Sequence, residues 1–400
     1  MTHGYRIGSV VCRCEKRIME KGKKMNVHEM GRVLILGLAG AIIAGNTVAS
    51  NWSESITIKG DLRYRHEMIE AGEEDARHRQ RIRARLGVYA NVSPYTQVGI
   101  RLATGSTDPI STNQTLDGAS STKTFSLDLA YFETYHEAVP CLRITAGKLK
   151  NPFIKPAKSE LIWDGDWNPE GGAVTINKTL GQIDLTMIGA GLWLDERASG
   201  DDSYLVAGQG IGRFHFNDGK STVAVGVGFF NYVNTLGFEP YFDHDHSAGN
   251  TTVPYVEDEE VDTVLHYAND YDLIEVFGEI THKFQNTPVL VMADYVTNSG
   301  AYSLETGWLV GFQIGKAKKS GSWQLNYFYR EVEKDAVVGA FTSSDFGGGG
   351  TDSKGHVLGG AVQLARNTVF KMTYFINETG LSEYATEDFK RLQFDLQLKF

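Results

Sequence analysis

The stretch RHRQRIRARLG, residues 77–87, places an arginine at every second position. In an α-helix a step of two residues turns through about 200°, so these arginines would lie on two opposite faces and leave no apolar stripe to bury. In a β-strand they all share one face, and the opposite face becomes apolar through Ile82, Leu86 and Val88. The stretch therefore predicts a strand with one arginine face and one apolar face.

Composition extends this prediction to the whole chain of 400 residues. Glycine is abundant, with 44 residues, aromatic residues make up 11%, and there are 9 prolines. A chain of this length can form two ordinary globular domains or one large all-β domain, and this composition favours the second.

The longest apolar segment, residues 31–50, follows a lysine-rich stretch and ends in small residues. It predicts that residues 1–50 are an N-terminal extension with a secretory signal peptide, cleaved after about Ser50. An uncleaved membrane anchor is the alternative, although the segment is short for a helical span. Residues 1–50 hold eight of the 39 Lys and Arg and three of the 49 Asp and Glu, so cleavage leaves 31 basic and 46 acidic residues. This negative balance argues against nucleic acid as a partner.

From Asn51 onward the chain shows a series of runs of about ten alternating residues, separated by turn signals. Such runs are typical of a transmembrane barrel, in which each strand presents one face to lipid and the other to the lumen. Residues 51–400 are therefore predicted to form a single all-β domain, a transmembrane antiparallel β-barrel of about sixteen strands. The predicted strands are residues 54–68, 77–92, 95–105, 125–137, 140–149, 171–178, 183–194, 203–216, 221–233, 270–284, 287–298, 304–317, 321–332, 356–365, 368–377 and 389–400.

The connections between these runs alternate in length. Every second one is tight, as in EAVP and ARNT, whereas the others are mostly longer and polar, notably residues 105–124, 150–170, 234–269 and 333–355. This alternation is typical of the outer membrane of Gram-negative bacteria, where barrels have short periplasmic turns and long external loops. A sheet in hydrocarbon must also have no edges, because each unpaired backbone group there costs several kcal/mol.

A barrel explains why one strand has an arginine face and an apolar face. Each arginine that faced lipid near the middle of the membrane would cost about 2 to 4 kcal/mol, so the arginine face is expected to point into the lumen. The first strand and the third strand add arginines of the same orientation, which gives a basic patch on the lumen wall. The predicted basic wall consists of Arg63, Arg65, Arg77, Arg79, Arg81, Arg83, Arg85, Arg101 and Arg143.

The final strand, FKRLQFDLQLKF, is cleanly amphipathic. One face is apolar and aromatic, and the other is polar and charged. A last strand of this pattern that ends in phenylalanine resembles the recognition signal of the outer-membrane barrel assembly machinery, although any amphipathic strand at the end of a chain would look similar. The predicted signal residues are Phe394, Leu396, Leu398 and Phe400.

Several segments in the same order carry a family resemblance. RIRARLG, IRLATGSTDPISTNQTLDG, LDLAYFETY, ITAGKLKNPF, LIWDGDWNPEGGAV and DDSYLVAGQG together resemble the putative porin family of Gram-negative outer membranes. The resemblance is strongest from about residue 56 to residue 228. It implies a passive outer-membrane channel, and it leaves the choice of solute open.

The same resemblance implies a constriction loop. In sixteen-stranded porins the third external loop folds into the lumen, and here that loop is about residues 150–171. Its acids, facing the arginines, would set an electric field across the pore and orient a polar solute. The alternative is a loop packed on the rim, with two of the aspartates acting as turn caps. The candidate constriction acids are Glu160, Asp164, Asp166 and Glu170.

The sequence thus predicts an outer-membrane porin, a water-filled channel for passive diffusion of ions and small hydrophilic solutes. We expect no catalytic residues, metal site or cofactor. The expected partners are outer-membrane lipid and lipopolysaccharide, the barrel assembly machinery, the permeating solutes and a possible homotrimer. The alternative function is an outer-membrane barrel with a blocked lumen that acts as an enzyme or as a structural or adhesive protein.

Overall fold

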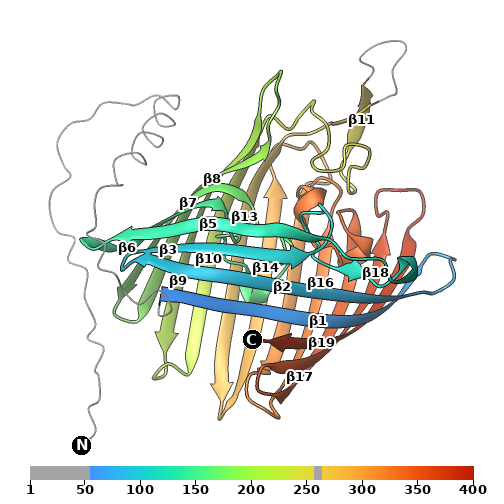
Figure 1. Cartoon of the computed structure of the whole chain (residues 1–400). Coiled ribbons are helices and arrows are strands. Elements are labelled where there is room, and N and C mark those ends of the chain that lie inside the picture. Colours follow the sequence, from blue (N-terminus) through green and yellow to red (C-terminus); the bar gives the residue numbers. More distant parts are fainter. Residues whose placement is uncertain (1–54, 256–263) are drawn as a thin grey trace, which may run out of the picture.

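The computed structural model describes residues 55–255 and 264–400, and the predicted signal peptide lies outside them. Sixteen long antiparallel strands form one sheet that closes on itself, so the predicted fold class is confirmed. Figure 1 shows these strands wrapped around the barrel. None of the predicted strand ends differs from the observed one by more than 3 residues.

The barrel strands follow one another around the wall in chain order. They are β1 (Ile56–Ala71), β2 (Arg77–Ser93), β3 (Thr96–Thr104), β5 (Phe125–His136), β6 (Val139–Lys148), β7 (Glu170–Leu180), β8 (Ile183–Asp195), β9 (Ser203–Phe216), β10 (Ser221–Val233), β13 (Tyr271–Phe284), β14 (Thr287–Asn298), β15 (Thr306–Gly315), β16 (Trp323–Val332), β17 (Ser353–Ala365), β18 (Thr368–Thr379) and β19 (Glu387–Lys399).

Two shorter sets of strands lie outside this series. β4 (Gln114–Thr115) lies between β3 and β5 in the chain, and it pairs with β2. β11 (Thr252–Tyr255) and β12 (Val264–Tyr267) form a separate hairpin in the connection between β10 and β13. Among the described residues, no helix has the length and apolar character needed to cross a membrane.

The barrel closes where β19 meets β1. The two strands pair antiparallel over eleven positions, from Asp61 opposite Lys399 to Ala71 opposite Phe389. Just beyond this ladder, Gly60 and Phe400 exchange two backbone hydrogen bonds, each 3.0 Å long. Both edges of the sheet are thereby paired, which a sheet in hydrocarbon requires.

The outward face of the wall is apolar. Tyr64 on β1, Leu86 on β2 and Ile100 on β3 are 46%, 44% and 49% exposed although all are apolar or aromatic. Their neighbours of the opposite parity, such as Arg65 and Arg83, are 4% and 7% exposed. Lipid covers the outward set in a membrane, so this pattern is that of a transmembrane barrel.

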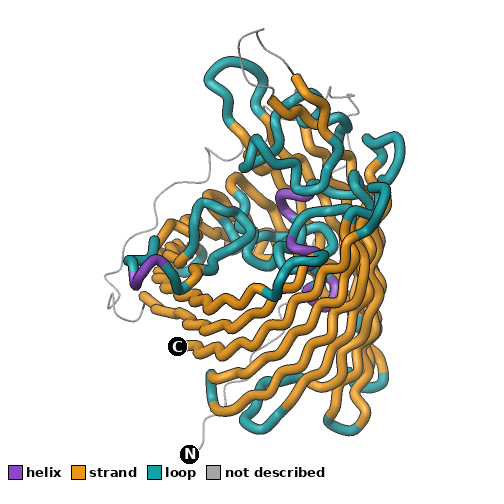
Figure 2. Tube along the Cα trace, turned by 90° about the vertical axis from the view of Figure 1, so that its right-hand side faces the viewer, coloured by secondary structure: helices purple, strands orange, loops and turns teal. Residues whose placement is uncertain are grey.

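Short turns gather at one end of the barrel and longer loops at the other (Figure 2). The alternation is not strict, because the turn at 316–322 has the same length as the loops at 196–202 and 299–305. Four external connections are much longer than the rest. They are residues 105–124, residues 149–169 (loop L3), residues 234–270, and residues 333–352 (loop L7).

The long loops turn inward and bring a hydrophobic core into the lumen. Trp163 and Trp167 of L3 stack with their ring centroids 4.5 Å apart, and Phe341 of L7 lies 5.2 Å from Trp167. Trp163 also contacts Phe230 of β10 edge to face at 5.3 Å. All four side chains are at most 6% exposed. L3 and L7 are therefore packed against the wall on the β10 side, and they face the wall of β1, β2 and β19.

Candidate functional site

The arginines of β2 lie on the lumen wall in register with charged residues of β1 and β19. Arg81 lies opposite Arg65, which lies opposite Asp395. Two positions along, Arg83 lies opposite Arg63. This grid follows directly from the period-two spacing in the sequence, because antiparallel pairing brings residues of one parity into rows on one face.

Carboxylates of the same wall bind most of these arginines. Asp61 on β1 accepts hydrogen bonds from Arg83 and Arg85, with the Nη2 of Arg83 3.0 Å away. Glu67 lies 2.5 Å from Arg79 and 3.5 Å from Arg81. Asp61 and Glu67 have the same parity on β1 as Arg63 and Arg65, so they lie on the arginine face of the wall.

Asp395 on β19 is the third wall carboxylate. It accepts two hydrogen bonds from Arg65, at 2.6 and 2.9 Å, in a bidentate arrangement. Arg63 lies 4.0 Å from the same carboxylate and also donates to Asn113. The paired charges hold the guanidinium groups in fixed positions along the wall.

L3 contributes one carboxylate to this wall. The Oδ1 atom of Asp166 lies 3.5 Å from Arg83 and 3.4 Å from Arg85, and the Oδ2 atom accepts a hydrogen bond of 2.8 Å from Thr112. Burial acts to raise the pKa of Asp166, but the nearby Arg83 and Arg85 outweigh it and hold that pKa below its ordinary value. Asp166 thus faces the arginines as an ionised group.

Polar contacts hold L3 in this position from the far wall. The backbone N–H of Ile154 donates to Gln209 of β9 at 2.8 Å, and the Gln209 side chain donates back to the Ile154 carbonyl at 2.9 Å. The N–H of Ala157 donates to Glu279 of β13 at 2.9 Å. The Ser159 hydroxyl donates to Asp294 of β14 at 3.0 Å. L3 is therefore anchored to strands on the side of the lumen opposite the arginines.

Asp164 and Glu160 bind L7 and do not contact the arginines. The backbone N–H and the hydroxyl of Ser344 both donate to Asp164 at 2.9 Å. Glu160 accepts hydrogen bonds from Gly165 at 2.9 Å and from Ser343 at 3.0 Å. These two acids do not face the arginines as predicted, because backbone N–H groups and hydroxyl groups of L3 and L7 donate to their carboxylates.

Glu170 also lies away from the arginines. It is the first residue of β7, and its outward parity is shared with Ile176, which is 37% exposed. Its carboxylate pairs with Lys148 of β6 at 2.9 Å. Of the four predicted constriction acids, Asp166 is the one whose side chain contacts the arginine wall.

L7 supplies a second aspartate that sequence reasoning missed. Asp345 lies 3.2 Å from Arg65 and 2.7 Å from Arg391 of β19. Burial opposes the shift, but these two arginines hold the pKa of Asp345 below its ordinary value. The sequence did hold a sign that a further arginine faces the lumen. Arg391 has the same parity on β19 as Asp395, so both side chains point inward.

The remaining predicted arginines lie at other places along the lumen wall. Arg101 of β3 donates to Asp128 of β5. Arg143 of β6 pairs with Glu133 and is 47% exposed, near the turn at 137–138 on the periplasmic side. Arg77 lies at the external start of β2, where its side chain is exposed. These three do not contact Asp166 or Asp345.

The predicted C-terminal signal residues share the outward face of β19. Leu396, Leu398 and Phe400 are 38%, 40% and 65% exposed, and Phe394 stacks with Phe370 of β18 at a centroid distance of 6.3 Å. Of the inward residues between them, Asp395 and Gln397 are buried. The four outward residues form an apolar and aromatic row beside the seam of the barrel.

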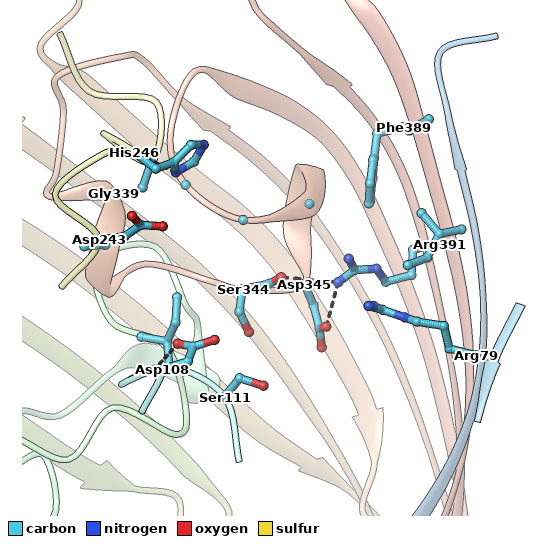
Figure 3. A pocket seen from close by; sticks show the side chains of 18 of the residues that line it. Arg79, Asp108, Ser111, Asp243, His246, Gly339, Ser344, Asp345, Phe389 and Arg391 are labelled. Atoms are coloured by element: carbon cyan, nitrogen blue, oxygen red, sulfur yellow. Dashed lines mark hydrogen bonds and ion pairs between the residues drawn. The ribbon is translucent and has the colours of Figure 1, made fainter. Parts of the chain in front are cut away.

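A cavity of about 530 Å³ lies on the external side of Asp345. Figure 3 shows Arg79 and Arg391 on one side of it and Asp108, Asp243 and His246 on the other. Asp345 lies close to the arginine side, bonded to Arg391. The cavity is therefore an antechamber with charged walls of opposite sign, and we call it the outer chamber.

A porin family model matches the chain over almost the whole barrel. The family described as Putative porin matches residues 69–252 and 241–400. The chain belongs to this family. It is an outer-membrane porin of the Gram-negative type, and the family and fold are those of a channel rather than an enzyme.

Solved structures share the fold of this porin. OprB of Pseudomonas putida has a TM-score of 0.58 at 9% identity, over 87% of this chain and 95% of that chain. OmpF of Salmonella typhi has a TM-score of 0.51 at 9% identity, over 86% of this chain and 97% of that chain. At this identity the likeness shows the fold alone. No curated protein sequence matches the porin.

Proposed function

We propose that this porin passes ions and small hydrophilic solutes by passive diffusion through a water-filled lumen that L3 and L7 narrow. The observation that carries this proposal is the contact of Asp166 with Arg83 and Arg85. It brings an acid from a loop against a basic wall inside a closed barrel. Opposite charges held at such a place orient polar solutes and replace part of their lost hydration.

The wall retains an excess of positive charge after all these pairings. The ion pairs of β1, β2, β19 and the two loops join seven arginines to five carboxylates, which leaves two positive charges unmatched. We therefore expect the narrow part of the lumen to favour anions, because an arginine keeps its charge at any physiological pH. The external mouth of the channel has an excess of acidic residues, so we expect it to favour cations.

Lipid and other proteins are further proposed partners. The outward apolar face would contact outer-membrane lipid and, at its external rim, lipopolysaccharide. The row of Phe394, Leu396, Leu398 and Phe400 would be recognised by the barrel assembly machinery. We also propose a homotrimer by analogy with the strand number, which cross-linking of the folded porin in native membranes would detect.

The proposed function is tested on mature porin, from Asn51 onward, inserted into a planar bilayer under a salt gradient. Stepwise conductance with a reversal potential on the anion side is the expected result. Absence of conductance from porin that is shown independently to be folded would overturn the proposal. The arginines and L3 would then belong to a plug, and the barrel would be an enzyme or a structural or adhesive protein with a blocked lumen.

A further inference from the structure

The outer chamber has two sides of opposite charge. On one side lie Arg77, Arg79 and Arg81 of β2 together with Arg391 of β19. On the other side lie Asp108, from the connection after β3, and Asp243 and His246, from the connection after β10 (Figure 3). A solute on its way to the narrow part of the lumen would pass between these two sides.

The arginine side has unused capacity to bind a carboxylate. The Nε atoms of Arg79 and Arg391 are buried and have no hydrogen-bond partner among the described residues. Among the described residues, Arg79 shares the carboxylate of Glu67 with Arg81, and Arg391 shares that of Asp345 with Arg65. An anionic oxygen placed between these guanidinium groups would receive strong charge-assisted hydrogen bonds.

The acidic side is suited to an ammonium group. The Oδ1 atom of Asp108 accepts a hydrogen bond of 2.9 Å from the N–H of Ile110, which orients the carboxylate at the surface of the chamber. Asp243 is exposed, and His246 accepts a hydrogen bond of 3.2 Å from the N–H of Ala248 through its Nδ1 atom. Neither Asp108 nor Asp243 forms an ion pair with an arginine or a lysine among the described residues.

The balance of charge distinguishes between classes of solute. The lining holds four arginines and the carboxylates of Glu74, Asp75, Asp108, Asp243 and Asp345, of which Asp345 lies on the arginine side. A solute that is only anionic would bind one side and leave the acids unmatched, and a cation would do the reverse. A solute with both charges pairs with both sides. Specificity arises because a solute with a single charge leaves the charges of one side unpaired, which weakens its binding.

We propose that the outer chamber is a binding site for small zwitterionic solutes, which carry a carboxylate at one end and an ammonium group at the other. The carboxylate binds Arg79 and Arg391, and the ammonium group binds Asp108 and Asp243. This inference rests on the proposed channel function and names the solute class that the chamber selects.

The test uses three probes with the same four-carbon skeleton. γ-Aminobutyrate carries both charges, butyrate only the negative one, and butylammonium only the positive one. Each is added in turn to the bathing solution of the reconstituted porin under an excess of potassium chloride, and the fall in ion current is measured as a function of concentration. We expect γ-aminobutyrate to act at a concentration about tenfold lower than either single-charge probe, because it makes one more charged contact.

Three variants connect the result to the chamber. Arg79→Gln and Asp108→Asn should each abolish the preference for γ-aminobutyrate, whereas Lys220→Gln, which removes a positive charge at a periplasmic turn, should leave it intact. Asp108 lies in an external loop, so its variant keeps the test valid if Arg79→Gln fails to fold. Equal action of the three probes on a conducting porin, or an unchanged preference in Asp108→Asn, would overturn the zwitterion site and leave the channel standing. Absence of conductance would overturn both.

Discussion

Asp166 of L3 and Arg83 of β2 lie 3.5 Å apart inside the barrel, although 83 residues separate them in the chain. The contact exists because L3 is anchored on the far wall by Gln209 and Asp294 and reaches across the lumen. A loop held at one side and charged at the other can narrow a pore without filling it. Asp345 of L7 repeats this arrangement against Arg65 and Arg391.

The first prediction concerns the basic wall. Joint replacement of Arg81, Arg83 and Arg101 by glutamine should shift the reversal potential toward cations, and the ratio of cation to anion permeability should rise about two- to fivefold. The physical reason is that three positive charges leave the wall while its carboxylates stay: Asp61 keeps only Arg85, Glu67 keeps only Arg79, and Asp128 loses Arg101. Lys220→Gln is the control, since it removes a charge outside the lumen. An unchanged reversal potential would show that these arginines do not line the conducting path.

The second prediction concerns the loop acid. Asp166→Asn should shift the reversal potential in the opposite direction, toward anions, because Arg83 and Arg85 lose a shared carboxylate. Glu170→Gln is the matched control, since it removes a carboxylate from the same segment but on the outward parity. Equal shifts in the two variants would contradict the position of Asp166 in the pore.

The third prediction concerns pH. Arg83 and Arg85 hold the pKa of Asp166 below its ordinary value of about 4, despite burial. A depressed pKa means that the contact is present above the ordinary pKa and is lost as the pH falls through the lower value of the folded porin. The difference in permeability ratio between wild type and Asp166→Asn should therefore stay constant from about pH 8 to about pH 5. A difference that shrinks within this range would show that Asp166 takes up a proton there.

The fourth prediction concerns the seam of the barrel. A methyl group on Gly60 would overlap the Phe400 ring and lie 2.5 Å from the Arg85 carbonyl oxygen. Gly60→Ala should lower the free energy of unfolding by about 1 to 3 kcal/mol, because the backbone there has no room to move away. Gly189→Ala is the control, since nothing lies within 4 Å of its added methyl group. Urea unfolding of the two variants in lipid vesicles measures the difference, and equal stabilities would contradict the close packing at the seam.

The strands could be predicted from the sequence because their signal is local. Alternation of polar and apolar residues fixes which side chains face lipid, and turn residues fix where each strand ends. The direction of the arginines followed from the cost of placing charge in hydrocarbon. Both arguments need only neighbouring residues.

The loops could not be predicted in the same way. Asp164 and Asp166 are two residues apart and chemically identical, yet one binds Ser344 of L7 and the other binds Arg83. Their difference arises from the path of L7, which brings Ser344 and Phe341 to Asp164 from about 180 residues further along the chain. No local pattern marks Asp345 either, since its partners lie on β1 and β19.

The period-two spacing of the β2 arginines also sets a length scale for transport. Successive lumen-facing guanidinium groups on one strand stand about 7 Å apart along the strand. Salt screens charges beyond about 8 Å at physiological ionic strength. An anion that leaves one arginine is thus already within the unscreened reach of the next, from Arg79 down to Arg85. We therefore expect anions to pass from one arginine to the next along this strand, and a lower salt concentration would lengthen the reach of each arginine without changing their order.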